Sequence, residues 1–135
     1  MPHKLYVNLP VKDLDRAVDF FAALGFSFNP KFTDENAACM IINDSTSVML
    51  LVEPFFAGFT NKPVADAHAG TEVLLALSLD SREAVDAFVA TVAVAGASTL
   101  LDAKDYGFMY QRAFADLDGH QWEVFWMDES QMPAK

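Results

Sequence analysis

The stretch Asp116-Leu-Asp-Gly-His-Gln-Trp-Glu-Val-Phe-Trp126 decides the fold, because it holds a turn signal between two strand-like segments. Asp118 followed by Gly119 favours a tight turn, since glycine adopts positive φ without steric cost. The flanks, residues 108–114 and 120–126, are rich in aromatic and β-branched residues, which is typical of strands. We therefore predict a β-hairpin over residues 108–126.

The second strand of this hairpin carries one carboxylate among apolar residues. Side chains alternate along a strand, so one face carries Gln121, Glu123 and Phe125 and the other carries Trp122, Val124 and Trp126. An unpaired buried carboxylate is costly. Glu123 is therefore expected to have a partner, to face a wet cavity, or to serve a site.

Composition and charge set the class of protein that the sequence predicts. With 135 residues, 53% of them hydrophobic, we expect one globular domain with a substantial core. A net charge of −10 without a basic stripe makes nucleic acid an unexpected partner. No apolar run has membrane-spanning length and no signal pattern opens the chain, so we expect a cytoplasmic protein that does not engage a membrane. The lone Cys39 predicts a buried thiol.

The first part of the chain predicts the order β-α-β-β-β. The strands are expected at residues 4–11, 26–33, 37–42 and 47–52. A helix begins after Asp13, a capping residue, and ends at Gly25. Its apolar stripe is formed by Leu14, Ala17, Val18, Phe21 and Leu24.

The same order returns in the second part. The strands are expected at residues 72–79 and 98–101, followed by a loop over 102–107 and the hairpin. A helix capped at Asp80-Ser81 and ended by Gly96 carries the stripe Ala84, Val85, Phe88, Val89 and Val92. The segments Ala17-Val-Asp-Phe-Phe21 and Ala84-Val-Asp-Ala-Phe88 are alike, which indicates a tandem duplication.

We therefore predict an α+β fold of two βαβββ modules with curved mixed sheets around a cavity. Residues 1–135 form a single domain, with module one at about 3–53, a connector at 54–71, module two at about 72–127 and a tail at 128–135. The connector carries Phe55, Phe56 and Phe59, which either plug a gap between the modules or form a flap over a pocket. Residues 64–69 are expected to form a short helical turn.

The sheet faces that the helices leave open are expected to line the cavity. They carry Tyr6, Asn8, Met49, Glu72, Leu74, Ala76, Gln111, Ala113 and Glu123. This mixture of apolar, amide and carboxylate groups is typical of a small-molecule site. We expect Phe55 and Phe56 to contribute to ligand binding as well.

Three segments resemble the vicinal oxygen chelate superfamily, which includes glyoxalase I, bleomycin-resistance proteins, fosfomycin-resistance enzymes and extradiol dioxygenases. They are residues 7–21 with Gly25-Phe26, residues 84–86 with 95–97, and Asp116–Glu123. The last is similar to the closing Asp-Pro-Asp-Gly-Asn-x-x-Glu signature, with Leu117 in place of proline. The sequence of these segments is most similar to a bacterial lactoylglutathione lyase-like subfamily. The resemblance implies the duplicated βαβββ fold over residues 4–127.

The resemblance also implies where a metal would bind in metal-using members, which supply four inward His, Gln or Glu ligands. Those positions fall here on Tyr6, Met49, Leu74 and Glu123. Only Glu123 is a plausible ligand for a divalent ion, although a shifted strand would bring Glu72 near it. The three histidines, His3, His68 and His120, are expected at surface or turn positions. No metal or other cofactor is therefore expected, and a divalent ion is the alternative.

Three functions stay open. The first is metal-independent binding of a small cationic or polar molecule in an inter-module or dimer cavity, with Phe55, Phe56, Phe59 and Tyr6 stacking on it. The second is a lactoylglutathione lyase-like enzyme in which Glu123 is the catalytic base and a divalent metal is optional. The third is a dimerising domain whose cavity is filled by its own side chains. Family members are commonly dimers, so the resemblance implies a homodimer.

Overall fold

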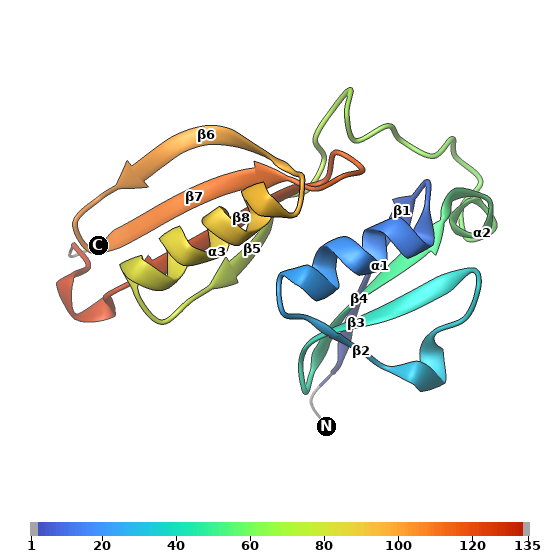
Figure 1. The fold of residues 1–135 in the computed structure, drawn as a ribbon, viewed down its shortest axis with the longest axis horizontal. Coiled ribbons are helices and arrows are strands. Elements are labelled where there is room, and N and C mark those ends of the chain that lie inside the picture. The colour runs from blue at the N-terminus through green and yellow to red at the C-terminus, as the bar shows by residue number, and fades with distance from the viewer. Residues whose placement is uncertain (1–2, 134–135) are drawn as a thin grey trace. The chain divides into compact units, whose positions relative to one another are not determined.

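A computed structural model describes residues 3–133 of the chain (Figure 1). The chain divides into two compact units, the first unit at Met1–Ala65 and the second unit at Asp66–Lys135. The boundary falls inside the predicted connector, and each unit contains one βαβββ module. The predicted α+β class and the tandem modules are confirmed.

The first unit is a four-stranded sheet with one long helix on one face. Its elements are β1 (Leu5–Val11), α1 (Leu14–Ala23), β2 (Ser27–Phe28), a 3-10 helix (Pro30–Phe32), β3 (Ala37–Asn43), β4 (Thr46–Val52) and α2 (Glu53–Ala57). The strand order is β1-β4-β3-β2, with β1 parallel to β4 and the other pairs antiparallel. Asp13 caps α1 as predicted, since its carboxylate accepts from the Arg16 amide at 3.1 Å.

The second unit repeats this arrangement. Its elements are β5 (Leu75–Ser78), α3 (Arg82–Val94), β6 (Ser98–Asp105), β7 (Met109–Ala115), β8 (Gln121–Met127) and a 3-10 helix (Glu129–Gln131). The order β5-β8-β7-β6 mirrors that of the first sheet. The Ser81 hydroxyl caps α3 by accepting from the Ala84 amide at 3.0 Å. The duplication predicted from the helix segments is thus present in the topology.

Each helix buries its apolar stripe against one face of its sheet. The buried residues of α1 are Leu14, Ala17, Phe20 and Phe21, and those of α3 are Val85, Val89 and Val92. Phe20 was absent from the predicted stripe, so the buried face of α1 is wider than a single row. The Phe20 ring packs edge to face on that of Phe21, with ring centroids 5.0 Å apart. The thiol of Cys39 is buried as predicted.

Two strands are shorter than predicted. The strand expected at 26–33 stops at Phe28, because the Asn29 side chain accepts from the Lys31 amide at 3.0 Å and starts a 3-10 helix. The strand expected at 72–79 covers only Leu75–Ser78. Its sole neighbour in the sheet is β8, and Leu75 pairs with Trp122 near the start of that strand, so the ladder cannot extend far toward Glu72.

Three further segments differ from the sequence predictions. The strand expected at 98–101 continues to Asp105, through the region expected to be a loop, because β7 is long enough to pair with it across two register shifts. Glu53–Ala57 forms a short helix that was not predicted, with Pro54 in its first turn, where proline fits. The helical turn expected at residues 64–69 begins only at Asp66, whose carbonyl oxygen accepts from the amides of Ala69 and Gly70 at 3.0 and 3.2 Å.

The sheet faces opposite α1 and α3 are called the open faces. On the first sheet Asn8 pairs with Met49, and on the second Ala76 and Ala113 both pair with Glu123. The residues that alternate with them, such as Leu9, Leu50, Trp122 and Val124, are buried. The strand phases therefore follow the prediction. Within residues 3–133, no helix has both the length and the apolar character needed to cross a bilayer.

Candidate functional site

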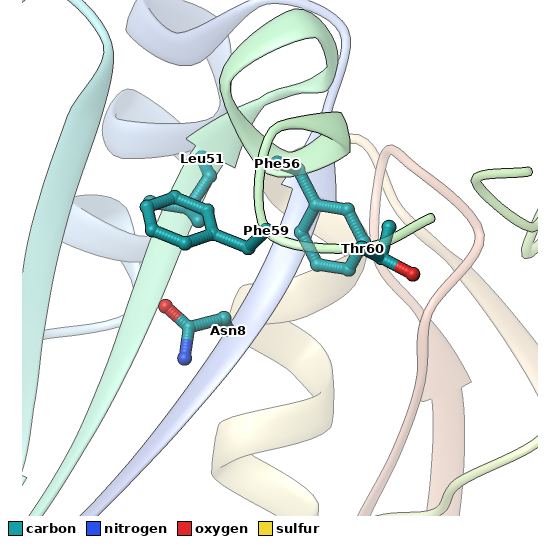
Figure 2. A pocket seen from close by; sticks show the side chains of 5 residues that line it. All are labelled: Asn8, Leu51, Phe56, Phe59 and Thr60. Carbon is teal, nitrogen blue, oxygen red and sulfur yellow. The ribbon is translucent and has the colours of Figure 1, made fainter. Parts of the chain in front are cut away.

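The open face of the first sheet carries a pocket of about 430 Å³ beside α2. It is lined by Asn8, Leu51, Phe56, Phe59 and Thr60. Figure 2 shows Asn8 on β1 and Leu51 on β4, with the two rings from the segment that follows β4 next to them. This pocket is called the aromatic pocket. It joins residues that lie more than forty positions apart in sequence, through the parallel pairing of β1 with β4.

The backbone of the α2 segment sets the positions of the two rings. Gly58 follows α2, and its amide donates to the Phe55 carbonyl oxygen at 3.1 Å, while the Phe59 amide donates to that of Phe56 at 3.0 Å. Phe59 is 72% exposed and rests edge to face on Phe55, with ring centroids 5.1 Å apart. Phe56 and Phe59 therefore line the pocket, whereas Phe55 supports Phe59 from outside the lining.

The lining of the aromatic pocket is apolar with two neutral polar groups. The Asn8 amide nitrogen donates to the Tyr6 carbonyl oxygen at 3.3 Å, so the Asn8 side-chain oxygen is the group left to accept from a ligand. The Thr60 hydroxyl can donate or accept. No charged residue belongs to this lining. Such a pocket suits a planar apolar group that carries a hydrogen-bond donor.

A second hollow of about 210 Å³ lies where β1 and β4 begin, and it is called the polar hollow. Besides Tyr6, Phe32, Cys39 and two aliphatic residues, its lining is mostly polar. The polar residues from the strands and their loops are Lys4, Asn29, Asn43, Asp44, Ser45 and Ser47. Apart from Tyr6, the sequence predictions did not include these residues, because they come from four separate segments that only the folded sheet brings together.

The second unit holds Glu123 on its open face with a partner from the neighbouring strand. The Gln111 side-chain nitrogen donates to a Glu123 carboxylate oxygen at 2.7 Å, and both residues are half-buried. The strand neighbours of Glu123 on either side are Ala76 and Ala113, whose small side chains leave the carboxylate room on the face. Of the three alternatives expected for Glu123, the structure bears out the first: the carboxylate has a partner, and that partner is Gln111.

The remaining predicted ligand-binding residues are distributed as follows. Tyr6 is half-exposed in the polar hollow, and Met49 is half-buried beside Asn8. Glu72 and Leu74 lie in the exposed segment before β5, four and two residues short of Ala76, which is the residue paired with Glu123. The structure therefore brings Gln111 to Glu123 but does not bring Glu72 or Leu74 onto a strand beside it.

The residues at the family's metal positions do not fit a divalent ion. Those positions are Tyr6, Met49, Leu74 and Glu123, and of the four only Glu123 supplies a carboxylate. A phenol, a thioether and an aliphatic side chain supply none of the imidazole or carboxylate donors that such ions prefer. Leu74 also lies before β5, outside the strand that pairs with β8. Over residues 3–133, no group of three or more His, Cys, Asp or Glu side chains is placed to hold a metal.

A buried carboxylate, Asp116, organises the hairpin turn of the second unit and was not singled out from the sequence. It accepts from the Trp122 indole nitrogen at 3.0 Å and from the amides of Asp118 and His120, each at 3.0 Å. Burial raises the pKa of Asp116 above its usual value, against the opposing effect of these donors and of His120. The Asp-x-Asp-Gly spacing was the available signal, since Asp side chains commonly accept from amides two residues on.

The histidines of the second unit lie at this turn, as predicted. The His120 amide donates to Asp116, and His68 packs against Gly119 so closely that a methyl group there would stand 2.7 Å from its Nδ1. Gly119 has a φ of +88°, which glycine tolerates best. The segment that follows Asp66 is therefore docked on the hairpin turn.

Comparison with known proteins supports the relationship predicted from sequence. Residues 4–43 match the family described as bleomycin resistance protein-like N-terminal. A hypothetical protein from S. aureus is 28% identical and has a TM-score of 0.79, covering 93% of this chain and 94% of its own. A glyoxalase/bleomycin resistance protein/dioxygenase family enzyme from Burkholderia phytofirmans is 19% identical, with a TM-score of 0.76 and coverages of 90% and 96%. No curated protein sequence matches the chain.

A fosfomycin resistance protein from Mesorhizobium loti shares the fold as well. It is 13% identical, with a TM-score of 0.70, and the match covers 97% of each chain. The fold is thus that of the glyoxalase/bleomycin-resistance/dioxygenase proteins. This fold and the N-terminal family match together support the predicted resemblance to the vicinal oxygen chelate superfamily. The lactoylglutathione lyase-like subfamily is named by none of these relatives and stays a prediction.

Proposed function

We propose that this protein binds a small organic molecule with an aromatic ring in the aromatic pocket, without a metal ion. The observation that carries the proposal is the pocket of about 430 Å³ between the open face of the first sheet and the rings of Phe56 and Phe59. Its volume falls within the range of about 300–1,000 Å³ that is usual for ligand pockets. The fold relationship supports the proposal only in general terms, because relatives of this fold have diverse activities.

The lining suggests how a ligand would be held. A planar ring can pack against Phe56, Phe59 and Leu51, and aromatic pairs contribute about 0.5–1.5 kcal/mol beyond the area they bury. A donor on the ligand can reach the Asn8 side-chain oxygen, and the Thr60 hydroxyl can bind a second polar atom. We therefore propose an aryl compound with an amide or amidine group as the ligand class.

The net charge of the protein favours cationic ligands at long range. The net charge of −10 attracts cations and repels anions, but no charged residue lines the pocket itself. A cation should therefore bind somewhat better than its neutral analogue at low salt. That advantage should shrink as salt is added, because charges beyond a Debye length of about 10 Å at 0.1 M are screened.

The proposal can be tested by amide NMR titration in EDTA with benzamidine, benzamide and benzoate, three compounds of nearly equal shape. We expect shifts at the amides of Asn8, Leu51, Phe56 and Thr60, with affinities in the order benzamidine, benzamide, benzoate. Phe59→Ala should weaken benzamide binding several-fold. Phe32→Ala is the matched control, because Phe32 is exposed in the same unit and lies outside this pocket. Absence of shifts, or equal effects of the two variants, would overturn the proposal.

A second candidate is the lyase-like activity, which one observation favours. Glu123 is held on the open face of the second sheet by Gln111, so a carboxylate is positioned there with an amide donor beside it. A base and a hydrogen-bond donor are what proton transfer next to a carbonyl needs. The test is turnover of the methylglyoxal–glutathione hemithioacetal by the wild type and Glu123→Gln. Equal background rates with EDTA and with added nickel or zinc would remove this candidate.

The third hypothesis, a dimerising domain with a filled cavity, has less support because the first unit retains a pocket of ligand size. The homodimer itself stays a prediction. Measuring the molar mass in solution by light scattering across a dilution series would test it. A mass near 14.9 kDa at every concentration would contradict the predicted dimer.

A further inference from the structure

The aromatic pocket and the polar hollow lie on one face of one sheet and reach the two ends of one row of residues. On that face β1, β4 and β3 contribute successive rows, and the middle row is Asn8, Met49 and Cys39. Asn8 lines the aromatic pocket and Cys39 lines the polar hollow, so both spaces reach this row. The next row, Tyr6, Ser47 and Ile41, forms part of the polar hollow.

From this arrangement we propose that the two hollows are subsites for the two ends of a single elongated ligand. The proposal rests on the proposed function and extends it. An aryl head binds in the aromatic pocket, and a tail crosses the middle row and places a carbonyl or amide oxygen in the polar hollow. The ligand class is therefore an aryl compound with an acyl or amide group on a short aliphatic chain.

Met49 is the side chain between the two subsites. It alternates with the buried Val48 and Leu50, so it points to the open face, where it is half-buried between Asn8 and Cys39. A methionine side chain is unbranched and adapts its shape at low cost, which makes it suitable for a passage that must admit an aliphatic chain. Met49 is thus assigned as the residue over which the tail crosses.

The chemistry of the polar hollow favours an oxygen acceptor. The side-chain oxygens of Asn29 and Asn43 already accept from the amides of Lys31 and Ser45, at 3.0 and 2.9 Å. These asparagines therefore offer their amide nitrogens as donors, and Lys4 and the Ser47 hydroxyl add further donors. Asp44 is the one carboxylate in the lining, so a cationic tail is the competing possibility that the test must separate.

The walls of the polar hollow suit the aliphatic part of the tail. Tyr6, Phe32 and Ile41 are large hydrophobic residues with 47%, 56% and 38% of their surface exposed. Tyr6 and Ile41 stand on either side of Ser47, on β1 and β3. A chain laid along this row would cover both apolar side chains and still leave its terminal oxygen near the Ser47 hydroxyl.

The distance between rows sets the length of the tail. Same-face residues of a strand are about 6.6 Å apart, so a chain of roughly four to six carbons takes a head group at Asn8 to the row of Ser47. The probes are benzamide, 3-phenylpropanamide, 5-phenylpentanamide and 7-phenylheptanamide, with dissociation constants measured by NMR titration. We expect affinity to rise to the pentanamide and then level off, with new shifts at the amides of Ser45 and Ser47.

Burial of the aliphatic chain of the ligand also increases affinity. Variants of the polar hollow distinguish this effect from hydrogen bonding to the ligand oxygen. Lys4→Ala/Ser47→Ala should weaken 5-phenylpentanamide by about tenfold, the factor expected for one charge-assisted hydrogen bond or two ordinary ones, and leave benzamide unchanged. Lys12→Ala removes the same charge from the same unit outside both hollows and should leave both probes unchanged.

Each outcome decides between the two proposals. If benzamide binds but lengthening the chain gives no gain, or the gain survives in Lys4→Ala/Ser47→Ala, the two-subsite inference is wrong and the aromatic pocket stands alone. If 5-phenylpentylammonium binds more tightly than the amide at a salt concentration that screens the net charge of the protein, and Asp44→Asn removes that difference, the acceptor assignment is overturned in favour of Asp44. If benzamide itself does not bind, the proposed function fails first.

Discussion

Gln111 and Glu123 are diagonal neighbours on the open face of the second sheet, joined by a hydrogen bond of 2.7 Å from amide nitrogen to carboxylate oxygen. Gln111 pairs with Phe125 and Glu123 with Ala113, so the two side chains reach each other across the diagonal that long residues can span. The bond satisfies a carboxylate that would otherwise stand alone among aromatic and alanine neighbours. It also orients Glu123 for any further partner.

This pair should be energetically coupled. Glu123→Ala and Gln111→Ala are each expected to lower the free energy of unfolding, and the double variant should lose less than the sum, by about 1 kcal/mol, the net value of such a bond. Urea unfolding of the four proteins measures the coupling. Strict additivity would show that the contact does not persist in solution. Benzamide affinity should be unchanged throughout, since neither residue lines the aromatic pocket.

The buried Asp116 should be the most sensitive carboxylate to substitution. Asp116→Ala leaves the Trp122 indole and two backbone amides without their acceptor, which should cost about 3 kcal/mol of unfolding free energy. Asp116→Asn can keep the two backbone bonds through its oxygen and should lose roughly half as much. Urea unfolding compares the two. If Asp116→Asn lost as much unfolding free energy as Asp116→Ala, the expected contribution of the two backbone hydrogen bonds would be contradicted.

The pH dependence of Asp116 has a definite sign. Its pKa is raised in the folded protein, so its contribution to stability is complete below the unfolded pKa and declines as the pH rises through the folded value. The stability of the wild type relative to Asp116→Asn should therefore decrease from acidic to neutral pH. A relative stability that increases with pH would mean that the hydrogen bonds to the ionised form outweigh its burial.

Arg82 and Asp105 form a bidentate ion pair whose titration is opposite in sign. The guanidinium donates to both carboxylate oxygens at 2.7 and 2.9 Å and lowers the pKa of Asp105 to about 2. The pair contributes to the free energy of unfolding above the pKa of Asp105 in the unfolded chain, about 3.9. This contribution is lost as the pH falls through about 2. Carboxyl NMR should show Asp105 titrating near 2, and at a higher pH in Arg82→Ala, where only the Gly107 amide still lowers the pKa of Asp105. An unchanged midpoint would disprove the pairing.

Gly119 and Gly107 provide a matched pair of glycine substitutions. Both have positive φ, +88° and +81°, but an added methyl group meets His68 at Gly119 and nothing within 4 Å at Gly107. Gly107→Ala should therefore cost only the backbone term of about 1–2 kcal/mol, and Gly119→Ala should cost clearly more. Thermal and urea unfolding test the difference. Equal losses would mean that the segment at His68 is not docked on the turn.

Local signals in the sequence were sufficient for the order of the helices and strands along the chain. Asp13 and Ser81 cap their helices through side-chain hydrogen bonds, and Gly25, Gly96 and Gly119 have the positive φ that their positions require. These features depend on near neighbours in sequence. Alternation also gave the correct faces of β8, because Trp122 and Val124 are buried on the helix side while Glu123 lies on the open face.

The lengths of β2, β5 and β6 were not predictable in the same way. β2 ends where the Asn29 side chain starts a 3-10 helix, and the extents of β5 and β6 depend on their register with β8 and β7. The same limit applies to the candidate site. Phe56 was expected at a ligand site, but Leu51 and Thr60 were not, since their relation to Asn8 depends on the parallel pairing of β1 with β4. Pairing between distant segments is what single-sequence patterns do not encode.

The most direct measurement is a crystal structure of the protein with benzamide, grown in the presence of EDTA. If the aromatic pocket binds the ligand, we expect electron density for the ring against Phe56, Phe59 and Leu51. The ligand amide nitrogen should lie within hydrogen-bond distance of the Asn8 side-chain oxygen, and no metal should be present at the site. Density for the ring at another place, or a pocket that holds only solvent at saturating ligand, would contradict the proposed function.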